Sequence, residues 1–221
     1  MDLARTCAAP RRHGGVELAS ILAFVPAAAK FTTDDFVDAA VRLVVAGGPG
    51  AATASAVAAA VGAPSGSVYH RFATRSDLLA TTWLRSARRF HHAFLPTLTG
   101  ADPVAAAVDA ARQVVRWCLR NRDAATLLAR YGRDDFVAAD CSPAVLAEAE
   151  ASDTVLREAL AAFLARFPTA DHDRVLLAVV DGPLALVRRR LRTSGLGKDT
   201  VETAADVARR LLAPGGRRSG R

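Results

Sequence analysis

A short part of the chain, residues 53–75, holds several side chains that can hydrogen-bond or pair with an anion. They are Thr53, Ser65, Ser67, Tyr69, His70 and Arg75. Hydroxyl, imidazole and guanidinium groups donate hydrogen bonds to phosphate and sugar oxygens and to base edges, which is how proteins hold and read nucleic acids. These groups can do so only if a rigid element presents them outward, so the local sequence must supply that element.

Two short helices joined by a glycine turn are predicted here. Thr53 can cap the first helix, and Gly62 supplies the left-handed residue that ends it. Pro64 is expected at the first position of the second helix, where its missing N–H leaves no hydrogen bond unmade. Val68 and Phe72 point together into a core, so the polar residues between them are left exposed. In a helix-turn-helix, the N-terminal part of this second helix faces the major groove of DNA.

A third helix, over residues 33–46, precedes this pair and ends at the glycine-rich residues 47–50. The spacing of ten positions then falls in register with a known pattern: Gly48, Thr53, Val57, Ala58, Gly62, Gly66, Tyr69, Phe72, Arg75 and Leu78. This spacing resembles the DNA-binding domain of the TetR family of bacterial transcriptional regulators, over about residues 32–80. Beyond that range, the chain resembles the family only in its all-helical character.

Three positions depart from the family's usual pattern. Pro64 stands where the family has serine, Arg75 where it has lysine, and Arg71 where it has an aromatic residue. Loss of the serine removes a capping hydroxyl, so Ser65 or a backbone group is expected to take over that task. Arginine in place of lysine keeps a charge that can pair with phosphate. The target sequence does not follow from the resemblance, because it is set by side chains that vary among members.

The resemblance implies that the predicted recognition residues contact DNA. We assign Thr53, Ser65, Tyr69, His70 and Arg75 to phosphate or sugar positioning, and Ser67 with the neighbouring backbone to base edges. Simpler interpretations stay open for each residue. Thr53 could serve only as a helix cap, Tyr69 could only pack, and His70 could be a solvated surface residue.

The composition agrees with a DNA-binding protein. The chain has 221 residues, 51% of them hydrophobic, which suffices for a small DNA-binding module and one larger core. Its formal net charge of +7 favours a polyanionic partner, although proteins that merely avoid self-association share such a balance. No apolar run reaches the roughly 20 residues of a membrane helix, so we expect a soluble, cytoplasmic protein with no membrane contact.

The cysteines and the two ends of the chain predict little chemistry. Cys7, Cys118 and Cys141 show no CxxC spacing, which argues against a disulfide framework or a metal site, and no cofactor is expected. Residues 1–30 imitate a secretory signal only superficially, and we expect a disordered extension, a mis-assigned start or a basic arm near DNA. The basic residues 214–221 are likewise expected to be disordered.

The rest of the chain alternates helical periodicity with short breaks. Helices are predicted over residues 74–95, 104–120, 123–131, 156–167, 173–192 and 200–212.

The helix over 173–192 is apolar nearly all round, and the last helix has one apolar face. Pairing both with their copies in a second subunit would bury them in a four-helix interface. Such a homodimer could hold two recognition helices about 34–36 Å apart, in successive major grooves of a near-palindromic site.

An effector site is expected in this larger helical region. Candidate lining residues are Trp83, Phe90, Trp117, Tyr131, Phe163 and Asp181. Ligand cavities are mostly apolar with a few polar groups, but aromatic residues at helical spacing are more often ordinary core. Asp181 lies in an apolar run and is followed by Gly182 and Pro183, which open the helix. It is either satisfied by an arginine or by the broken backbone, or it anchors a ligand.

The sequence therefore predicts an all-α protein. A helix-turn-helix DNA-binding domain over residues 31–80 is followed by a helical ligand-binding and dimerisation domain over residues 81–213. The expected function is a repressor that binds double-stranded operator DNA as a homodimer and is released by a small molecule of unknown identity. One alternative is a DNA-binding dimer with no small-molecule effector.

A helical enzyme is the other alternative. Its acid–base groups would be His91, His92, Asp171, His172 and Asp173. No GxGxxG, Walker, GxSxG or HExxH pattern accompanies them, so catalysis is not expected.

Overall fold

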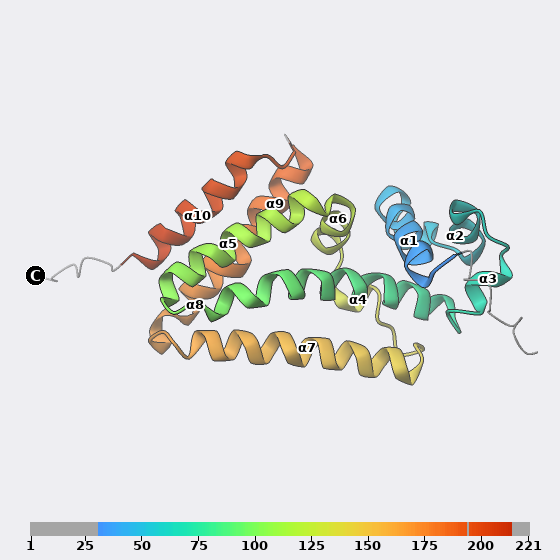
Figure 1. Ribbon diagram of the computed structural model, residues 1–221, viewed down its shortest axis with the longest axis horizontal. Coiled ribbons are helices and arrows are strands. Elements are labelled where there is room, and N and C mark those ends of the chain that lie inside the picture. The colour runs from blue at the N-terminus through green and yellow to red at the C-terminus, as the bar shows by residue number, and fades with distance from the viewer. Residues whose placement is uncertain (1–30, 194, 214–221) are drawn as a thin grey trace, which may run out of the picture. The chain divides into compact units, whose positions relative to one another are not determined.

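The computed structural model describes residues 31–193 and 195–213, and within these ranges it is helical without strands (Figure 1). The predicted extension 1–30 and the predicted tail 214–221 lie outside the described residues. The helices are α1 (Thr33–Gly47), α2 (Ala54–Val61), α3 (Gly66–Tyr69), α4 (Arg75–Phe94), α5 (Pro103–Arg120), α6 (Arg122–Arg130), α7 (Pro143–Leu164), α8 (His172–Leu176), α9 (Gly182–Arg192) and α10 (Lys198–Leu212).

The first helix begins where its sequence provides a reciprocal cap. The hydroxyl of Thr32 accepts a hydrogen bond from the Asp35 backbone N–H, while the Asp35 carboxylate accepts one from the Thr32 N–H at 2.7 Å. These bonds from Thr32 hold the pKa of Asp35 below its ordinary value. Phe36, Ala40 and Val44 are buried, and their spacing places them on one face of the helix.

Helices α2 and α3 form the predicted pair around a glycine turn. The Thr53 hydroxyl accepts from the Ala56 N–H at 3.1 Å, and Gly62 has φ +75°, the left-handed conformation that ends α2. Val68 and Phe72 are buried in a core shared with α1.

The start of α3 differs from the prediction at Pro64. The helix begins at Gly66 rather than at Pro64, and the Ser65 side chain makes no capping hydrogen bond. The Pro64 carbonyl instead accepts the Ser67 N–H at 2.9 Å, so a backbone group replaces the missing capping hydroxyl.

A second core lies among α4, α5, α7, α9 and α10, and includes Phe94, Trp117, Phe163 and Val187. Helix α4 belongs to both cores. Its Leu78 is buried with α1 to α3, whereas its Phe94 is buried in the second core. Figure 1 shows α4 as one long rod with α7 running alongside it. Its observed ends agree closely with the predicted helix over residues 74–95.

The last helix packs within its own chain. Val201, Ala204, Ala205 and Ala208 are buried, and α10 lies against α5 (Figure 1). The prediction that this apolar stripe faces a second subunit is therefore wrong for these four residues, because α5 presents a complementary row of small and branched residues that covers them.

The apolar segment before α9 contains a π-helical turn over Leu177–Asp181. Pro183 has no N–H to continue the α-helical ladder, and a Cβ added to Gly182 would lie 2.6 Å from the Leu177 carbonyl oxygen. These two residues open the helix as their sequence predicted. Asp181 is exposed at the end of this turn, and Leu177 is 45% exposed.

Candidate DNA interface and effector cavity

The predicted DNA-contacting residues lie on the surface around α2 and α3. Thr53, Ser65, Tyr69, His70 and Arg75 are exposed, and Ser67 is half-buried. Tyr69 is 63% exposed, which is unusual for so large a side chain and leaves its ring and hydroxyl free to contact another molecule. The assignment of these six residues to DNA contact stays a prediction.

Two of the six also stabilise the fold. Thr53 caps α2, as its simpler interpretation holds, and Arg75 donates a hydrogen bond to the Pro49 carbonyl at 2.6 Å. This bond ties the first turn of α4 to the loop before α2. Arg75 Nη2 is therefore already engaged by the backbone, and only the rest of its guanidinium is left for a phosphate.

Arg71, which stands where the family has an aromatic residue, fixes α3 to α1. Its guanidinium donates to the Ser67 carbonyl at 3.0 Å and to the Phe31 carbonyl at 2.6 Å, and it lies 4.8 Å from the centre of the Phe36 ring. Cation–π contact and two hydrogen bonds together hold a helix of only one turn in place. No local pattern predicts this role of Arg71, because Phe31 and Phe36 lie far from it along the chain.

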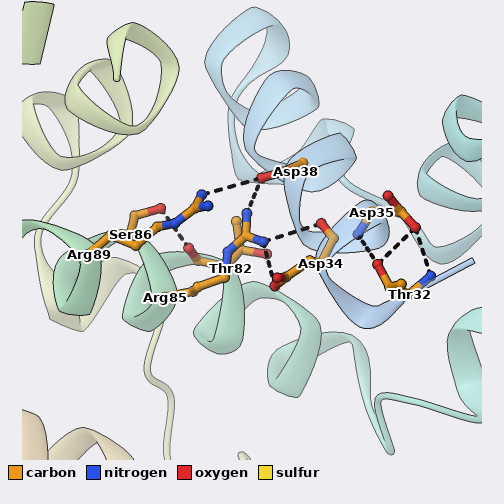
Figure 2. A network of polar contacts seen from close by, with 8 residues as sticks. All are labelled: Thr32, Asp34, Asp35, Asp38, Thr82, Arg85, Ser86 and Arg89. Carbon is orange, nitrogen blue, oxygen red and sulfur yellow. Dashed lines mark hydrogen bonds and ion pairs between the residues drawn. The ribbon is translucent and has the colours of Figure 1, made fainter. Parts of the chain in front are cut away.

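A network of ion pairs joins α4 to α1 (Figure 2). Arg85 Nη1 lies 2.7 Å from Asp34 Oδ1, and Nη2 of the same guanidinium pairs with Asp38. Arg89 also approaches Asp38, at 3.8 Å. The Arg85 side chain is only 11% exposed, so these pairs are less screened than ordinary surface pairs. They couple the orientation of α1 to that of α4.

Asp77 is a buried carboxylate whose role was not predicted from the sequence. It is 3% exposed and accepts the Ser142 N–H at 2.8 Å, which joins the start of α4 to the start of α7. An aspartate in the first turn of a helix is common, and only the fold brings Ser142 to it.

An apolar cavity of about 200 Å³ lies among α4, α5, α6, α7 and α9. Three of the six predicted effector residues line it, namely Trp83, Phe90 and Trp117. The other three do not. Tyr131 packs on Phe136 against the N-terminal core, Phe163 is buried in the second core, and Asp181 is exposed. Asp181 is thus no ligand anchor in this cavity, because the π turn directs it outward.

His91 is the titratable imidazole of this cavity, and the prediction of effector residues missed it. Its Nδ1 lies 3.5 Å from the Ser152 hydroxyl of α7. Burial lowers the pKa of His91 below its ordinary value of 6.5, although the Asp153 charge opposes the shift. His91 is therefore neutral near pH 7 and can donate or accept one hydrogen bond. Cys118 also lines the cavity, and burial raises the pKa of its thiol to about 12.

The residues considered for catalysis do not assemble into a recognisable site. His92 and Asp173 are exposed, Asp171 pairs with Arg174, and His172 lies 3.3 Å from the Phe167 carbonyl.

Within residues 31–193 and 195–213 no group of three or more histidine, cysteine or carboxylate side chains could hold a metal ion. In the same ranges, no helix combines the length and apolarity that crossing a bilayer requires.

Comparison with known proteins identifies the N-terminal part of the chain. Residues 36–82 match the model of the family described as bacterial regulatory proteins, tetR family. None of the curated proteins compared with the chain matches it.

Several solved structures share the fold. A TetR-like transcriptional regulator from Rhodococcus sp. RHA1 is 20% identical, with a TM-score of 0.61 over 82% of this chain and 96% of that one. The fatty acid degradation regulator FadR from Bacillus halodurans is 17% identical, with a TM-score of 0.62 over 82% and 98%. FadR from Bacillus subtilis, solved in complex with stearoyl-CoA, is 13% identical, with the same score and coverage.

The matched domain spans α1, α2, α3 and the first part of α4, and the similar structures extend the likeness through the remaining helices. A helix-turn-helix with an exposed second helix, followed by a larger helical bundle, is thus both observed in the structure and matched by comparison. Residues 36–82 of the chain therefore match the family described as bacterial regulatory proteins, tetR family, and the fold of the chain is similar to that of solved TetR-like transcriptional regulators.

Proposed function

We propose that this regulator is a ligand-responsive repressor, which binds a near-palindromic operator as a homodimer in the cytoplasm and is released by a small molecule. The observation that carries the proposal is the course of α4, which belongs to both cores. Its N-terminal half packs against the DNA-binding helices, and its C-terminal half lines the apolar cavity. A ligand that moves α4 therefore acts on both parts of the chain.

Helix α6 supplies a second connection between the cavity and the DNA-binding helices. Ala125, Leu128 and Ala129 of α6 line the cavity. At the end of the same helix, Arg130 donates a hydrogen bond to the Val45 carbonyl of α1 at 3.0 Å. A ligand that displaces α6 would therefore also displace α1. Coupling of about 1–3 kcal/mol between the two sites would weaken operator binding by roughly 5-fold to 150-fold.

The lining of the cavity indicates the kind of effector. Two tryptophans and a phenylalanine surround a volume of about 200 Å³, and His91 offers one hydrogen bond. An apolar cavity of about 150 Å³ accommodates benzene, whereas sites for drug-sized ligands start near 300 Å³. The expected effector is a compact apolar or aromatic molecule with a single polar group. Bacillus subtilis FadR, which shares this fold, was solved in complex with stearoyl-CoA, and the acyl chain of that ligand is apolar.

Dimerisation is proposed through the apolar surface that the single chain leaves open. Leu177 and Val207 are 45% and 41% exposed, on the π turn and on α10, two segments that pack together. A second copy that covers them would form the two-fold assembly that a near-palindromic site requires.

Selection of bound duplexes from a random DNA pool tests the DNA-binding and dimer parts together. The expected result is one near-palindromic site occupied by two chains. A protein that stays a single subunit, or prefers no duplex over bulk DNA at moderate ionic strength, would overturn the proposal.

The effector part is tested by repeating the operator titration with compact aromatic compounds that quench tryptophan fluorescence. At least one compound is expected to weaken operator binding in the range given above. If compounds bind in the cavity but operator affinity is identical, the alternative of a dimer without a small-molecule effector is favoured.

A further inference from the structure

An arginine-rich cleft of about 240 Å³ lies where α1, α4 and the junction between α5 and α6 meet. Its arginines are Arg42, Arg85, Arg89, Arg120 and Arg122, and two aspartates, Asp38 and Asp123, accompany them. The cleft shares no lining residue with the apolar cavity. The two sites also differ in chemistry, because charged side chains line the cleft whereas aromatic and aliphatic side chains line the cavity.

The positive charge of the cleft is only partly neutralised. Arg85 is held by Asp34 and Asp38, and Figure 2 shows Arg89 reaching the same Asp38. Arg42 and Arg120 are exposed and have no ion pair or hydrogen bond within residues 31–193 and 195–213. Two guanidinium groups from different helices thus border the cleft without a carboxylate of their own.

Backbone donors add to this charge. Asn121 precedes α6, but its side chain does not cap the helix, because its amide donates to the Trp117 carbonyl at 2.9 Å. Among the residues that the structure describes, no side chain accepts from the first N–H groups of α6, which lie at the positive end of the helix dipole. Arg85 Nε is also buried, and it has no hydrogen-bond partner in the described part of the chain.

We propose that this cleft binds a small, multiply charged anion that carries phosphate groups. Guanidinium groups pair with phosphate oxygens through two parallel hydrogen bonds, so several arginines from four helices match a ligand with several oxygens. A volume of about 240 Å³ holds a diphosphate group but excludes a folded protein segment. Free phosphorylated compounds and the phosphates of DNA share this chemistry, and we assign the cleft to the free compound.

Occupancy of the cleft is expected to change the affinity for DNA, and this consequence rests on the proposed function. The bound anion would connect Arg42 and Arg89, on α1 and α4, to Arg120 and Arg122 at the α5–α6 junction. It would also compete with Asp38 for Arg89. Because binding free energies are reciprocal, operator DNA would change the affinity for the anion by the same factor.

The first experiment measures binding without DNA. The full chain is titrated with inorganic pyrophosphate by calorimetry at physiological ionic strength. The expected result is saturable binding of one pyrophosphate per chain, which the double variant Arg42→Gln, Arg120→Gln weakens at least about tenfold. Both side chains are exposed and have no partner in the described part of the chain, so the variant should keep the wild-type thermal midpoint.

A matched double variant controls for net charge. Arg192→Gln, Arg210→Gln removes the same charge from exposed positions on α9 and α10, outside the cleft, and should bind pyrophosphate like the wild type. No saturable binding by the wild type, or an equal loss in both double variants, overturns the proposed site.

The second experiment distinguishes a free anion from DNA. Operator titrations over a range of salt concentrations should give the same salt dependence for the wild type and for Arg42→Gln, Arg120→Gln. If the variant instead lowers the slope by about two and the wild type binds no pyrophosphate, the arginines hold DNA phosphates and the proposal is wrong.

The coupling is tested separately. Pyrophosphate should change operator affinity at least about fivefold in the wild type, at constant ionic strength, and leave the cleft variant unaffected. An unchanged wild-type affinity overturns the coupling. The calorimetric result needs no operator, so failure of the proposed function would leave it standing.

Discussion

Tyr69, His70 and Arg71 follow one another in the chain but differ in their surroundings. Tyr69 and His70 project from α3 into solvent, whereas Arg71 turns back to hydrogen-bond the Ser67 and Phe31 carbonyls. The inward residue fixes the helix, and the two outward residues are left to contact a partner. These different roles explain how a helix of one turn can be held rigidly and still expose side chains to a partner.

Removal of the Tyr69 hydroxyl tests the DNA role of that side chain. Tyr69→Phe should weaken operator binding about tenfold, because a hydrogen bond to a charged phosphate is lost. The thermal midpoint should not change, since the side chain is exposed. Fluorescence anisotropy with operator duplex gives the affinity. Tyr131→Phe, the matched change at the other tyrosine, should bind normally, and equal affinities for the two variants would contradict the role.

Asp77 illustrates a residue whose importance is structural. Asp77→Ala should lower the free energy of unfolding by about 1–3 kcal/mol, because the Ser142 N–H would lose its buried acceptor. Urea unfolding followed by circular dichroism measures the change. Asp134→Ala removes an aspartate whose side chain is 96% exposed and should cost less than about 0.5 kcal/mol. Similar losses for both variants would show that the hydrogen bond to Ser142 contributes little.

At the scale of elements, the short helices depend on the residues between them. Gly62 lets α2 end in the left-handed conformation, and the Pro64 carbonyl then supports the first turn of α3. In α4, by contrast, the Thr74 cap at one end and a long amphipathic face define the helix locally. Periodicity therefore placed α4 and α5 well. It was wrong for α7, which spans Pro143–Leu164 rather than residues 156–167, and the start of α3 was misplaced by two residues.

A pair of glycine substitutions tests this account of the turn. An added Cβ meets nothing within 4 Å at Gly62 or at Gly66, so sterics with neighbours do not distinguish them. Gly62→Ala should lower the free energy of unfolding by about 1 kcal/mol, because alanine is strained at positive φ. Gly66→Ala should stabilise the fold by up to about 1 kcal/mol, because alanine favours the helix. Thermal unfolding of both variants measures the difference, and equal shifts would contradict the explanation.

At the scale of the whole molecule, the two cores are connected by α4 and α6 and by charged contacts between α1 and α4. The apolar cavity and the arginine-rich cleft are both lined by residues of α4, α5 and α6. The lining of the cavity is apolar, whereas that of the cleft is charged. Both sites adjoin segments that contact α1, so two different ligands could act on one DNA-binding unit. The stability of the fold is also expected to depend on His91, which lines the apolar cavity.

Burial of His91 predicts how stability varies with pH. Because the folded pKa lies below the ordinary value of 6.5, the folded chain binds this proton less readily than the unfolded chain does. The contribution is fully present above pH 6.5 and is lost as the pH falls toward the folded pKa. His91→Gln should remove this part of the pH dependence, as measured by urea unfolding from pH 7.5 down to about pH 5.

The exposed neighbour serves as the control for this prediction. His92→Gln should retain the wild-type loss of stability at acidic pH, because His92 is exposed. A wild-type chain whose stability does not fall between pH 6.5 and about pH 5 would contradict the buried, neutral imidazole.

Features that depend on neighbours a few residues apart could be predicted from the amino-acid sequence alone. Helical spacing, the Thr53 cap, the Gly62 stop and the opening of the helix at Gly182 and Pro183 are local, so they could be predicted and were found. Trp83, Phe90 and Trp117 were also predicted to line an effector site, and they line the apolar cavity. They could be named because the chain has few large aromatic side chains on the apolar faces of its helices.

Which helix faces pack against each other could be learned only from the folded chain. Periodicity shows that a helix has an apolar face but not which partner covers it, so the face of α10 was assigned to a second subunit although α5 covers it. The exposure of Asp181 and the gathering of arginines from four helices depend likewise on contacts between residues distant in the chain. Such contacts are fixed by the packing of complete helices, and no local pattern encodes them.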